Sequence, residues 1–417
     1  MSRIAIRAGC KKTEAGVIPE EWEEGHLSDQ IREPIRNGYS PVCPSHPTGT
    51  WILSLSAVSQ SGFDPTGVKP APKDDPKVLE NLLNDGDIVI SRSNTPDRVG
   101  LAGIYRGNPS PCAYPDLLMR VRLRSSLIPE FLLYRLLSFP GRRFFSDNAR
   151  GSSGSMVKID RTILKSFPVL LPPLIEQRQI VAALNDVDAL VSGLDRHIAK
   201  KRDLKQAAMQ QLLTGQRRLP EFSGAWRTMT VGDGVSLFSG QHILAQYCNT
   251  EGRGFPYLTG PSDFPDGKIR QTKYTEKPSA LCEADDILVT VKGSGSGTLV
   301  VADGVYCISR QLMAIRVRDW DRKFVYYSLL QNATKIKSAS TGLIPGLSRA
   351  DILEQILPVP PLVEEQAAVA TVLSDMDAEL TALEARRDKV LALKQGMMQE
   401  LLTGRTRLVA VEGDQNA

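Results

Sequence analysis

The sequence predicts an α+β protein in which two mixed α/β globules are joined by two long helices that form an antiparallel coiled coil, with pseudo-twofold symmetry. Three observations predict this class: a helical segment that occurs twice, coiled-coil spacing of apolar residues in both copies, and short β-type runs with dense Gly and Pro elsewhere. The boundaries that we assign are 1–171 for the first globule, 172–219 for the central helix, 220–358 for the second globule, 359–408 for the C-terminal helix, and 409–417 for a tail expected to be disordered.

The repeated helical segment is marked at both of its ends. Pro172-Pro173-Leu174 recurs as Pro360-Pro361-Leu362, and the stretch from Leu212 to Gly215 recurs from Leu401 to Gly404. The second copy has one extra residue near its start, after which the two copies are offset by 189 residues. Because no Pro follows inside either copy, each Pro-Pro pair marks where a helix can begin, and the closing glycine of each copy is a suitable C-terminal cap.

Apolar residues inside each copy recur at steps that alternate between four and three, which is the spacing of a coiled-coil seam. Eight of ten seam positions are apolar in each copy; the exceptions are Lys201 and Lys205 in the first copy, and Arg387 and Lys394 in the second. A helix from Ile175 to Leu213 would be about 58 Å long at 1.5 Å per residue. The apolar seam positions are Ile180, Leu184, Val187, Val191, Leu194, Ile198, Ala208 and Leu212, followed by Val369, Leu373, Met376, Leu380, Leu383, Val390, Met397 and Leu401.

The two globules look related in plan, although their sequences have diverged. The β-type runs at 87–90 and 286–289 each follow an acidic turn and open into a loop rich in small polar residues. Trp22 and Trp226 stand at matching entry positions, each a few residues before an aliphatic-x-Asp step. The predicted order is therefore globule, helix, globule, helix.

This plan resembles the specificity (S) subunit of type I restriction-modification systems. The resemblance covers nearly the whole chain and is carried by Gly16-Val17-Ile18-Pro19 with Trp22, by Leu171-Pro172-Pro173-Leu174 to Leu212-Leu213-Thr214-Gly215, and by Val359-Pro360-Pro361-Leu362 to Leu401-Leu402-Thr403-Gly404. It implies two target-recognition domains, at 1–171 and 220–358, each of which reads one half of a bipartite, gapped site in double-stranded DNA.

The same resemblance implies the partners. The two helices would dock methyltransferase (M) subunits, and two similar helix surfaces should accept two of them. Restriction/translocase (R) subunits would join through the M subunits. S-adenosylmethionine, ATP and Mg²⁺ are expected on partner subunits, and no cofactor on this chain.

Elementary geometry agrees with a bipartite site. Two similar globules on two similar helices can share a pseudo-twofold axis, which matches the pseudo-dyad of B-DNA. A separation near 58 Å exceeds one DNA turn of about 34–36 Å, which predicts two short blocks with unread base pairs between them. The net charge is only +4, and residues 1–171 hold 22 Lys and Arg against 18 Asp and Glu. The Lys and Arg residues that neutralise DNA phosphates must therefore be grouped locally, or a partner must supply part of the positive charge.

Motifs of enzymes are missing from the sequence. The Gly-Ser-rich loop at 293–297 lacks the spacing of a phosphate-binding loop. In the stretch from Asp286 to Lys292, Thr290 stands two residues before the lysine, whereas metal-dependent cleavage needs a second carboxylate to help hold the ion. The four His residues are far apart and lack metal-ligand spacing. We therefore predict no catalytic residue and no metal site. Six scattered Cys residues and the lack of an apolar run of about 18 residues favour a cytoplasmic protein outside the membrane.

Candidate DNA contacts are polar side chains on the predicted loops, because hydrogen-bonding groups there can reach base edges. They are Tyr39, Ser40, Arg92, Ser93, Asn94, Arg98, Arg150 and Ser152 in the first globule, and Gln241, His242, Lys292, Ser294 and Thr341 in the second.

Other functions remain open at the level of sequence. A specificity subunit of a related multi-subunit type II restriction-modification system would have the same fold. A stand-alone DNA-binding regulator should bind tightly alone, which the sparse charge disfavours. A coiled-coil scaffold that does not bind DNA would leave the polar loop clusters unexplained.

Overall fold

The computed structural model describes residues 9–13, 16–153, 156–293, 295–333 and 346–408. The predicted tail at 409–417 therefore lies outside the described residues. Contacts divide the chain into two compact units: unit 1 is Met1–Leu194 with Arg386–Ala417, and unit 2 is Asp195–Ala385. Each unit contains one globule and one half of each long helix, so the compact units differ from the four consecutive segments that the sequence suggests. Each unit is described by itself below.

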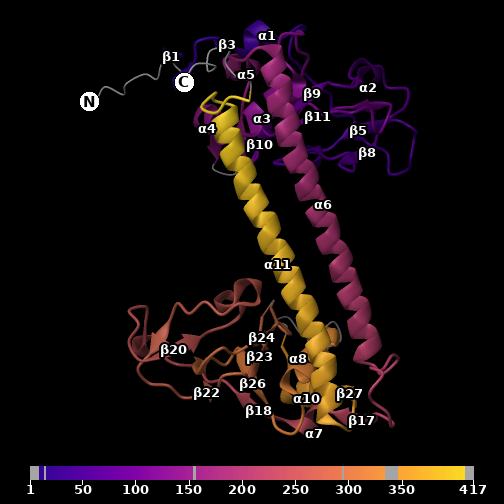
Figure 1. Ribbon diagram of the computed structural model, residues 1–417, viewed down its shortest axis with the longest axis vertical. Coiled ribbons are helices and arrows are strands. Elements are labelled where there is room, and N and C mark those ends of the chain that lie inside the picture. The colour runs from indigo at the N-terminus through magenta and orange to yellow at the C-terminus, as the bar shows by residue number, and fades with distance from the viewer. Residues whose placement is uncertain (1–8, 14–15, 154–155, 294, 334–345, 409–417) are drawn as a thin grey trace, which may run out of the picture. The chain divides into compact units, whose positions relative to one another are not determined.

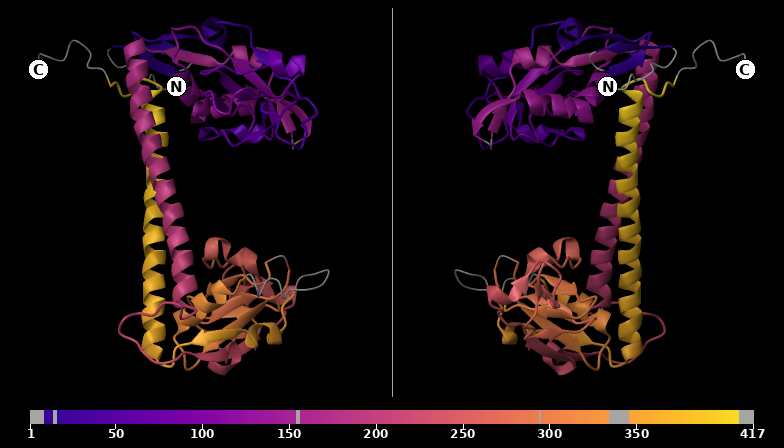
Figure 2. Two further views of the ribbon diagram at one scale, coloured as in Figure 1. Left: turned by 90° about the vertical axis from the view of Figure 1, so that its right-hand side faces the viewer. Right: turned by 90° about the vertical axis from the view of Figure 1, so that its left-hand side faces the viewer.

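The two long helices are α6 (Leu174–Leu212) and α11 (Val363–Leu401), and each has 39 residues. The helix predicted from Ile175 to Leu213 is thus found one residue earlier. In unit 2, Lys201 bonds to Glu379 and Lys205 bonds to Asp377, so residue numbers rise along α6 as they fall along α11. The two helices are antiparallel (Figures 1 and 2).

The predicted seam faces inward in both units. All twenty seam positions are buried or half-buried, whereas Leu190, Leu204, Leu391 and Leu393, which lie off the seam, are exposed. The charged seam positions are half-buried, and Lys205, for example, forms an ion pair with Asp377. The predicted seam positions are therefore the ones turned away from solvent.

The globule of unit 1 is built on a four-stranded antiparallel sheet with the order β11-β9-β13-β4. Its helices are α1 (Leu27–Gln30), α2 (Pro76–Glu80), α3 (Pro129–Leu137), α4 (Phe139–Asn148) and α5 (Arg161–Lys165). Its strands are β1 (Cys10–Thr13), β2 (Gly16–Pro19), β3 (Glu23–His26), β4 (Arg36–Asn37), β5 (Trp51–Leu53), β6 (Val58–Ser59), β7 (Gly62–Phe63), β8 (Val68–Pro70), β9 (Ile88–Ser91), β10 (Ser93–Asn94), β11 (Ala102–Ile104), β12 (Cys112–Ala113), β13 (Leu118–Val121), β14 (Arg150–Ser153), β15 (Met156–Lys158) and β16 (Pro168–Leu171).

The globule of unit 2 has a sheet of the same kind, with the order β18-β26-β23-β24. Its described α-helices are α7 (Val231–Gly234), α8 (Arg322–Gln331) and α10 (Arg349–Leu353). Its described strands are β17 (Arg227–Thr230), β18 (Val235–Ser239), β19 (Cys248–Asn249), β20 (Phe255–Leu258), β21 (Tyr274–Thr275), β22 (Leu281–Cys282), β23 (Ile287–Thr290), β24 (Leu299–Val301), β25 (Tyr306–Ile308), β26 (Leu312–Val317) and β27 (Ile356–Val359).

The central strands of the two globules correspond. The antiparallel sheet β11-β9-β13-β4 matches β24-β23-β26-β18, and the parallel pair of β12 with β5 matches the parallel pair of β25 with β20. The entry strand of each globule pairs with the strand that leads into a long helix, as β3 with β16 and β17 with β27. Two mixed α/β globules of one plan are therefore confirmed.

Each hydrophobic core includes the ends of both long helices. In unit 1, Ile180 and Leu184 of α6 and Leu401 of α11 are buried in the main core of the globule. In unit 2 the residues at the 189-residue offset do the same, with Val369 and Leu373 of α11 and Leu212 of α6. Since each globule shares its core with the helix ends, the helices are part of both units.

Two further observations bear on the classes of protein considered above. All six Cys residues are free. Among the described residues, no helix is long and apolar enough to cross a membrane.

Candidate nucleic-acid interface

The first turn of each long helix contains a buried glutamate that is held by a tryptophan and an arginine. In unit 1, Glu176 accepts hydrogen bonds from Trp22 Nε1 at 2.9 Å and from Arg407 Nε at 2.5 Å. In unit 2, Glu365 accepts from Trp226 Nε1 at 3.1 Å and from Arg218 Nε at 2.8 Å. The matching entry positions of the two tryptophans are thereby explained, because each fastens the start of its globule to a long helix.

In each unit, a tyrosine of the globule contacts an aspartate on one long helix, and a lysine of the other long helix pairs with the same aspartate. In unit 1, the Tyr134 hydroxyl donates to Asp188 at 2.8 Å, and Lys394 lies 2.5 Å from the same carboxylate. In unit 2, Tyr327 donates to Asp377 at 2.7 Å, and Lys205 lies 2.5 Å from it. Burial and the neighbouring carboxylate raise the pKa of both tyrosine hydroxyls.

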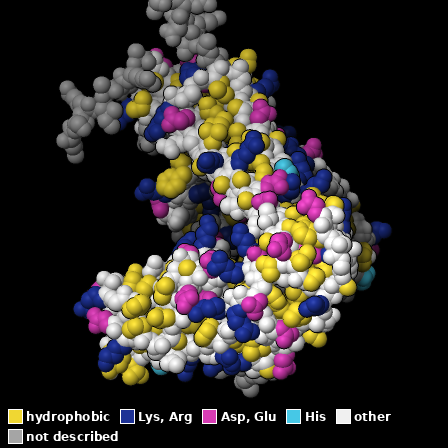
Figure 3. Space-filling model, turned by 60° about the horizontal axis from the view of Figure 1, so that its bottom comes forward, with side chains coloured by type: hydrophobic (Ala, Val, Ile, Leu, Met, Phe, Trp, Pro, Cys, Tyr) yellow, Lys and Arg dark blue, Asp and Glu magenta, His cyan; other side chains and the backbone are white. Residues whose placement is uncertain are grey.

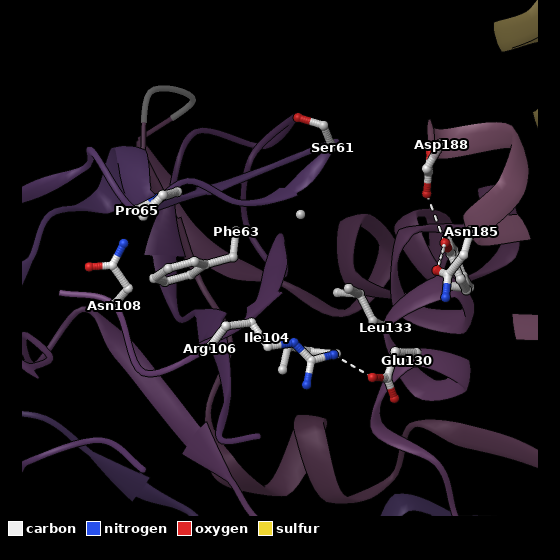
Figure 4. A pocket seen from close by; sticks show the side chains of 12 residues that line it. Ser61, Phe63, Pro65, Ile104, Arg106, Asn108, Glu130, Leu133, Asn185 and Asp188 are labelled. Carbon is white, nitrogen blue, oxygen red and sulfur yellow. Dashed lines mark hydrogen bonds and ion pairs between the residues drawn. The ribbon is translucent and has the colours of Figure 1, made fainter. Parts of the chain in front are cut away.

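A hollow of about 380 Å³ lies beside this cluster in unit 1. Ser61, Phe63, Arg106 and Glu130 line it, together with Asp188 of α6 (Figure 4). A hollow of about 370 Å³ occupies the corresponding place in unit 2. Corresponding residues line the two hollows, namely Ile104, Tyr134 and Asn185 in unit 1, and Val301, Tyr327 and Ser374 in unit 2.

The polar loops predicted to contact DNA share one backbone frame in the two units. At the end of β9, Arg92 N donates to Leu117 O at 2.8 Å, and Ile159 N donates to Arg92 O at 2.9 Å. At the end of β23, Val291 N donates to Gln311 O at 2.7 Å, and Leu347 N donates to Val291 O at 2.9 Å. The two loops therefore start from the same hydrogen-bonded platform.

A glycine fixes the neighbouring loop in each frame. Gly38 N donates to Leu118 O, and Gly240 N donates to Leu312 O. A Cβ on Gly38 would lie 2.0 Å from the carbonyl oxygen of Tyr114, and a Cβ on Gly240 would lie 2.1 Å from that of Ser309. Only glycine allows such a close approach of two backbones. The residues after each glycine, which the sequence singled out, are thus held against a turn.

In unit 1 the structure brings several of the predicted contacts together. Ser40 Oγ donates to Asp116 Oδ1 at 2.5 Å, and Arg92 reaches the backbone oxygen of Asp116 at 3.5 Å. Tyr39 is half-buried beside them and lies under Lys77, whose Nζ is 5.3 Å from the centre of its ring. Residues from three separate stretches of sequence therefore converge on one surface.

One predicted contact in unit 1 needs correction, and a second has local partners. The side chain of Ser93 is fully buried, so it faces the protein interior rather than a ligand. Asn94 is half-buried and organises its own loop, because it donates to Ser91 Oγ at 3.3 Å and accepts from Thr95 N at 2.9 Å. The sequence reasoning went wrong here because β10 pairs with β15, which turns these side chains toward local partners.

The remaining predicted residues of unit 1 lie in or next to a small three-stranded sheet. Arg150 is exposed in β14, which joins β15 and β10 in a three-stranded sheet, and Ser152 lies in the same strand. Arg98 is exposed in the loop after β10. The structure thus places Arg92, Arg98 and Arg150 around one small sheet, and DNA contact by them stays a prediction.

In unit 2, Gln241 and His242 are exposed directly after Gly240, and Gln241 N donates to Ile308 O at 3.0 Å. Lys292 is also exposed, and its backbone forms an isolated bridge with Gly346. Ser294 and Thr341 lie outside the described residues. The three described candidates of unit 2 are therefore all available to a ligand.

Sequence reasoning did not single out Asp116 in unit 1 or the pair Arg310 and Gln311 in unit 2. All three lie in the turns against which the two glycines pack. The usable signal was a polar residue one or two positions before the β-type runs that begin at Leu118 and Leu312. That signal was weak in the sequence. The turns are seen to lie beside the predicted loops only once the runs that begin at Leu118 and Leu312 pair with β9 and β23.

Charges on the surface are mixed. In the face shown in Figure 3, Lys and Arg side chains lie among Asp and Glu side chains. Several cations are already paired within their own unit, such as Arg122 with Asp87 at 2.6 Å and Arg316 with Asp286 at 2.8 Å. Among the described residues, no three His, Cys, Asp or Glu are arranged to hold a metal ion.

Comparison with known proteins decides the family. Residues 73–201 and 224–393 both match the type I restriction modification DNA specificity domain. The chain belongs to the specificity subunits of type I restriction-modification systems. Its function is DNA sequence recognition within such a system, and the comparisons favour neither a type II subunit, nor a stand-alone regulator, nor a scaffold.

Relatives of this specificity subunit match it over half to nearly all of its length. The putative type I restriction enzyme MjaX specificity subunit of Methanocaldococcus jannaschii is 30% identical, over 95% of this chain and 96% of its own length. The type I restriction enzyme EcoKI specificity subunit of Escherichia coli K12 is 26% identical, over 52% of this chain and 46% of its own length.

Two solved structures have the same fold. One is a chain from a study of complex assembly and conformational transition in a type I R-M system; it covers 93% of this chain and 99% of its own length, with a TM-score of 0.61 and 20% identity. The other is the S subunit from M. genitalium, which covers 91% of this chain and 96% of its own length, with a TM-score of 0.57 and 17% identity.

Proposed function

We propose that each unit of this specificity subunit reads one half of a bipartite, gapped site in double-stranded DNA. The observation that carries the proposal is the repeated backbone frame. Gly38 and Gly240 hold equivalent loops against equivalent turns, while the side chains presented there differ between the units. One scaffold with two sets of side chains is what recognition of two different half-sites requires, since base edges are read by side-chain hydrogen bonds.

The long helices offer a basis for the partners. The Tyr134–Asp188–Lys394 cluster and its counterpart in unit 2 give α6 and α11 matching surfaces, and two matching surfaces suit two copies of one methyltransferase subunit. Restriction/translocase subunits would then join through the methyltransferase subunits. We assign S-adenosylmethionine, ATP and Mg²⁺ to those partners, and we assign no catalytic step to this chain.

The decisive experiment is a genome-wide map of methylated bases in a host that carries this chain with its methyltransferase subunit. We expect two short blocks separated by a constant number of unread base pairs. Replacing the exposed Lys292 with Ala should alter or weaken only one block, because Lys292 belongs to unit 2 alone. A single continuous recognition sequence would contradict the proposal of two half-sites.

The partner assignment has separate tests. Native mass spectrometry of the purified complex should give two methyltransferase subunits per chain at saturation, and a single one would contradict the matching surfaces. The purified chain alone should show no nuclease, methyltransferase or ATPase activity. Turnover by a clean sample that a point change in this chain abolishes would show that the catalytic assignment is wrong.

A further inference from the structure

We propose that Asp116 in unit 1 and Arg310 in unit 2 are specificity-determining residues that read base edges from equivalent turns. This inference rests on the proposed function and deepens it. Both residues are the second residue of a four-residue turn, since Leu118 N donates to Pro115 O at 3.0 Å and Leu312 N donates to Ser309 O at 2.9 Å. Residues 116 and 117 therefore form the apex of the turn in unit 1, and residues 310 and 311 form the apex of the turn in unit 2.

The position of each apex is fixed by the surrounding backbone. The loop that follows Gly38 packs on the carbonyl group of Tyr114, and the loop that follows Gly240 packs on that of Ser309, at distances that leave no room for a Cβ. The opposite side of each turn accepts a hydrogen bond from the residue after the central strand. The acceptor is Leu117 O in unit 1 and Gln311 O in unit 2. Because both sides are held, the side chain at the apex is presented in a defined place.

In unit 2, Arg310 faces other hydrogen-bonding groups across a hollow. The hollow measures about 440 Å³ and is lined by His242, Thr259, Lys273, Arg310 and Gln311, among others. Arg310 is exposed, and within the described residues its guanidinium group forms no hydrogen bond or ion pair. An arginine with all its donors available can bond to O6 and N7 of guanine at once, which is the commonest specific contact in the major groove.

In unit 1, a carboxylate occupies the equivalent apex. Asp116 is half-buried, and Ser40 Oγ fixes its orientation at 2.5 Å. A carboxylate that only approached phosphates would weaken binding by repulsion. It is useful at this position if it accepts a hydrogen bond from a base, and the N4 amino group of cytosine is the donor that carboxylates read. Opposite charges at one position of a common frame give the two units different base preferences.

The test is selection from a randomised DNA library by the purified complex of this chain with its methyltransferase subunit. Arg310→Ala and Arg310→Lys should each lower the preference for one base of one half-site by about 5- to 150-fold, and should leave the other half-site unchanged. Asp116→Asn should change a base preference in the other half-site only. The control is Arg227→Ala, which removes an exposed arginine of unit 2 that lies in β17, on a different sheet.

The outcomes separate this inference from the proposed function. If the wild-type complex selects no bipartite site, the proposed function fails. If it selects one, and the Arg310 and Asp116 variants keep every base preference, the inference alone is wrong. A loss of affinity that is uniform across sequences, as a phosphate contact would give, also overturns it. In each variant the half-site read by the unaltered unit reports that the complex has folded and assembled.

Discussion

Replacing Glu176 with Gln should destabilise unit 1 far more than an ordinary surface change would. The carboxylate of Glu176 is fully buried, and each of its two oxygens accepts a hydrogen bond, Oε1 from Arg407 and Oε2 from Trp22. A Gln side chain has the same shape but carries one acceptor and one donor group. Its amide nitrogen must therefore face either the indole or the guanidinium group, and the charge of Arg407 loses its buried partner.

The expected cost can be worked out from the contacts. Removing one partner of a buried ion pair costs about 3–5 kcal/mol. Arg407 keeps a second bond to Glu21 at 2.8 Å, and its side chain is 19% exposed, so part of the loss is recovered. We therefore expect a decrease of about 2–4 kcal/mol in the free energy of unfolding of unit 1. Burial disfavours the charge of Arg407, but its hydrogen bonds to Glu176 and Glu21 still raise its pKa.

Native-state hydrogen exchange with mass spectrometry can measure this free energy separately for amides of each unit. The matched control is Glu21→Gln, which removes the exposed partner of the same arginine and should cost less than about 1 kcal/mol. The counterpart Glu365→Gln should reduce protection in unit 2 instead. Adding Arg407→Met to Glu176→Gln should cost less than the sum of the single changes.

The reasoning would be refuted if Glu176→Gln stayed within about 0.5 kcal/mol of the wild type, the range of an ordinary surface substitution. It would also be wrong if Glu21→Gln had an equal effect, because the cost would then come from Arg407 alone and not from the buried carboxylate.

Four further predictions concern single positions. Gly193→Ala and Gly396→Ala should each raise stability by about 0.5–1 kcal/mol in urea unfolding, because both glycines lie inside long helices and a Cβ there meets no atom within 4 Å. Gly240→Ala should lower the stability of unit 2 by about 1–3 kcal/mol and weaken one half-site in methylation mapping; an unchanged map would contradict the glycine frame. Burial raises the pKa of the Cys112 thiol from 9.0 to about 12. Because the unfolded chain then loses this proton at a lower pH than the folded protein does, the free energy of unfolding should fall as the pH rises from about 9 to 12. At pH 8.5, the Cys112 thiol of the native protein should be alkylated more slowly than the less buried thiols. Four residues inserted just before Leu212 lengthen α6 by about 6 Å and should lengthen the unread gap by one or two base pairs, whereas an active variant with the original gap would exclude the helix as a ruler.

The helical half of the fold could be read from the sequence because it depends on local periodicity. The steps of four and three from Ile180 to Leu212 place one stripe on one face of a helix, whatever the rest of the chain does. The two Pro-Pro pairs and the closing glycines marked the ends to within a few residues, and both glycines adopt positive φ, 71° at Gly215 and 70° at Gly404. The inserted residue before Glu365 also aligned correctly, since Glu176 and Glu365 make the same contacts.

The candidate interface was predicted only in part, because exposure in a loop depends on what pairs with it. The backbones of Arg92 and Arg150 both join β15 or the residue after it, but the neighbouring Ser93 is buried where β10 pairs with β15. Asp116 and Arg310 escaped notice because their turns are distant in sequence from the loops that they touch.

The sequence by itself determined the repeat, the two helices with their seam and the α+β class, because each follows from spacing along the chain. The family was indicated by a resemblance to known specificity subunits. Only the tertiary structure decided which segments lie side by side in the candidate interface. Strand pairing brings residues 38–40, 92, 116 and 150 together in unit 1, and residues 240–242, 292 and 310 in unit 2. Such contacts join residues tens of positions apart, and they are set by the packing of whole sheets, which no local pattern of residues encodes.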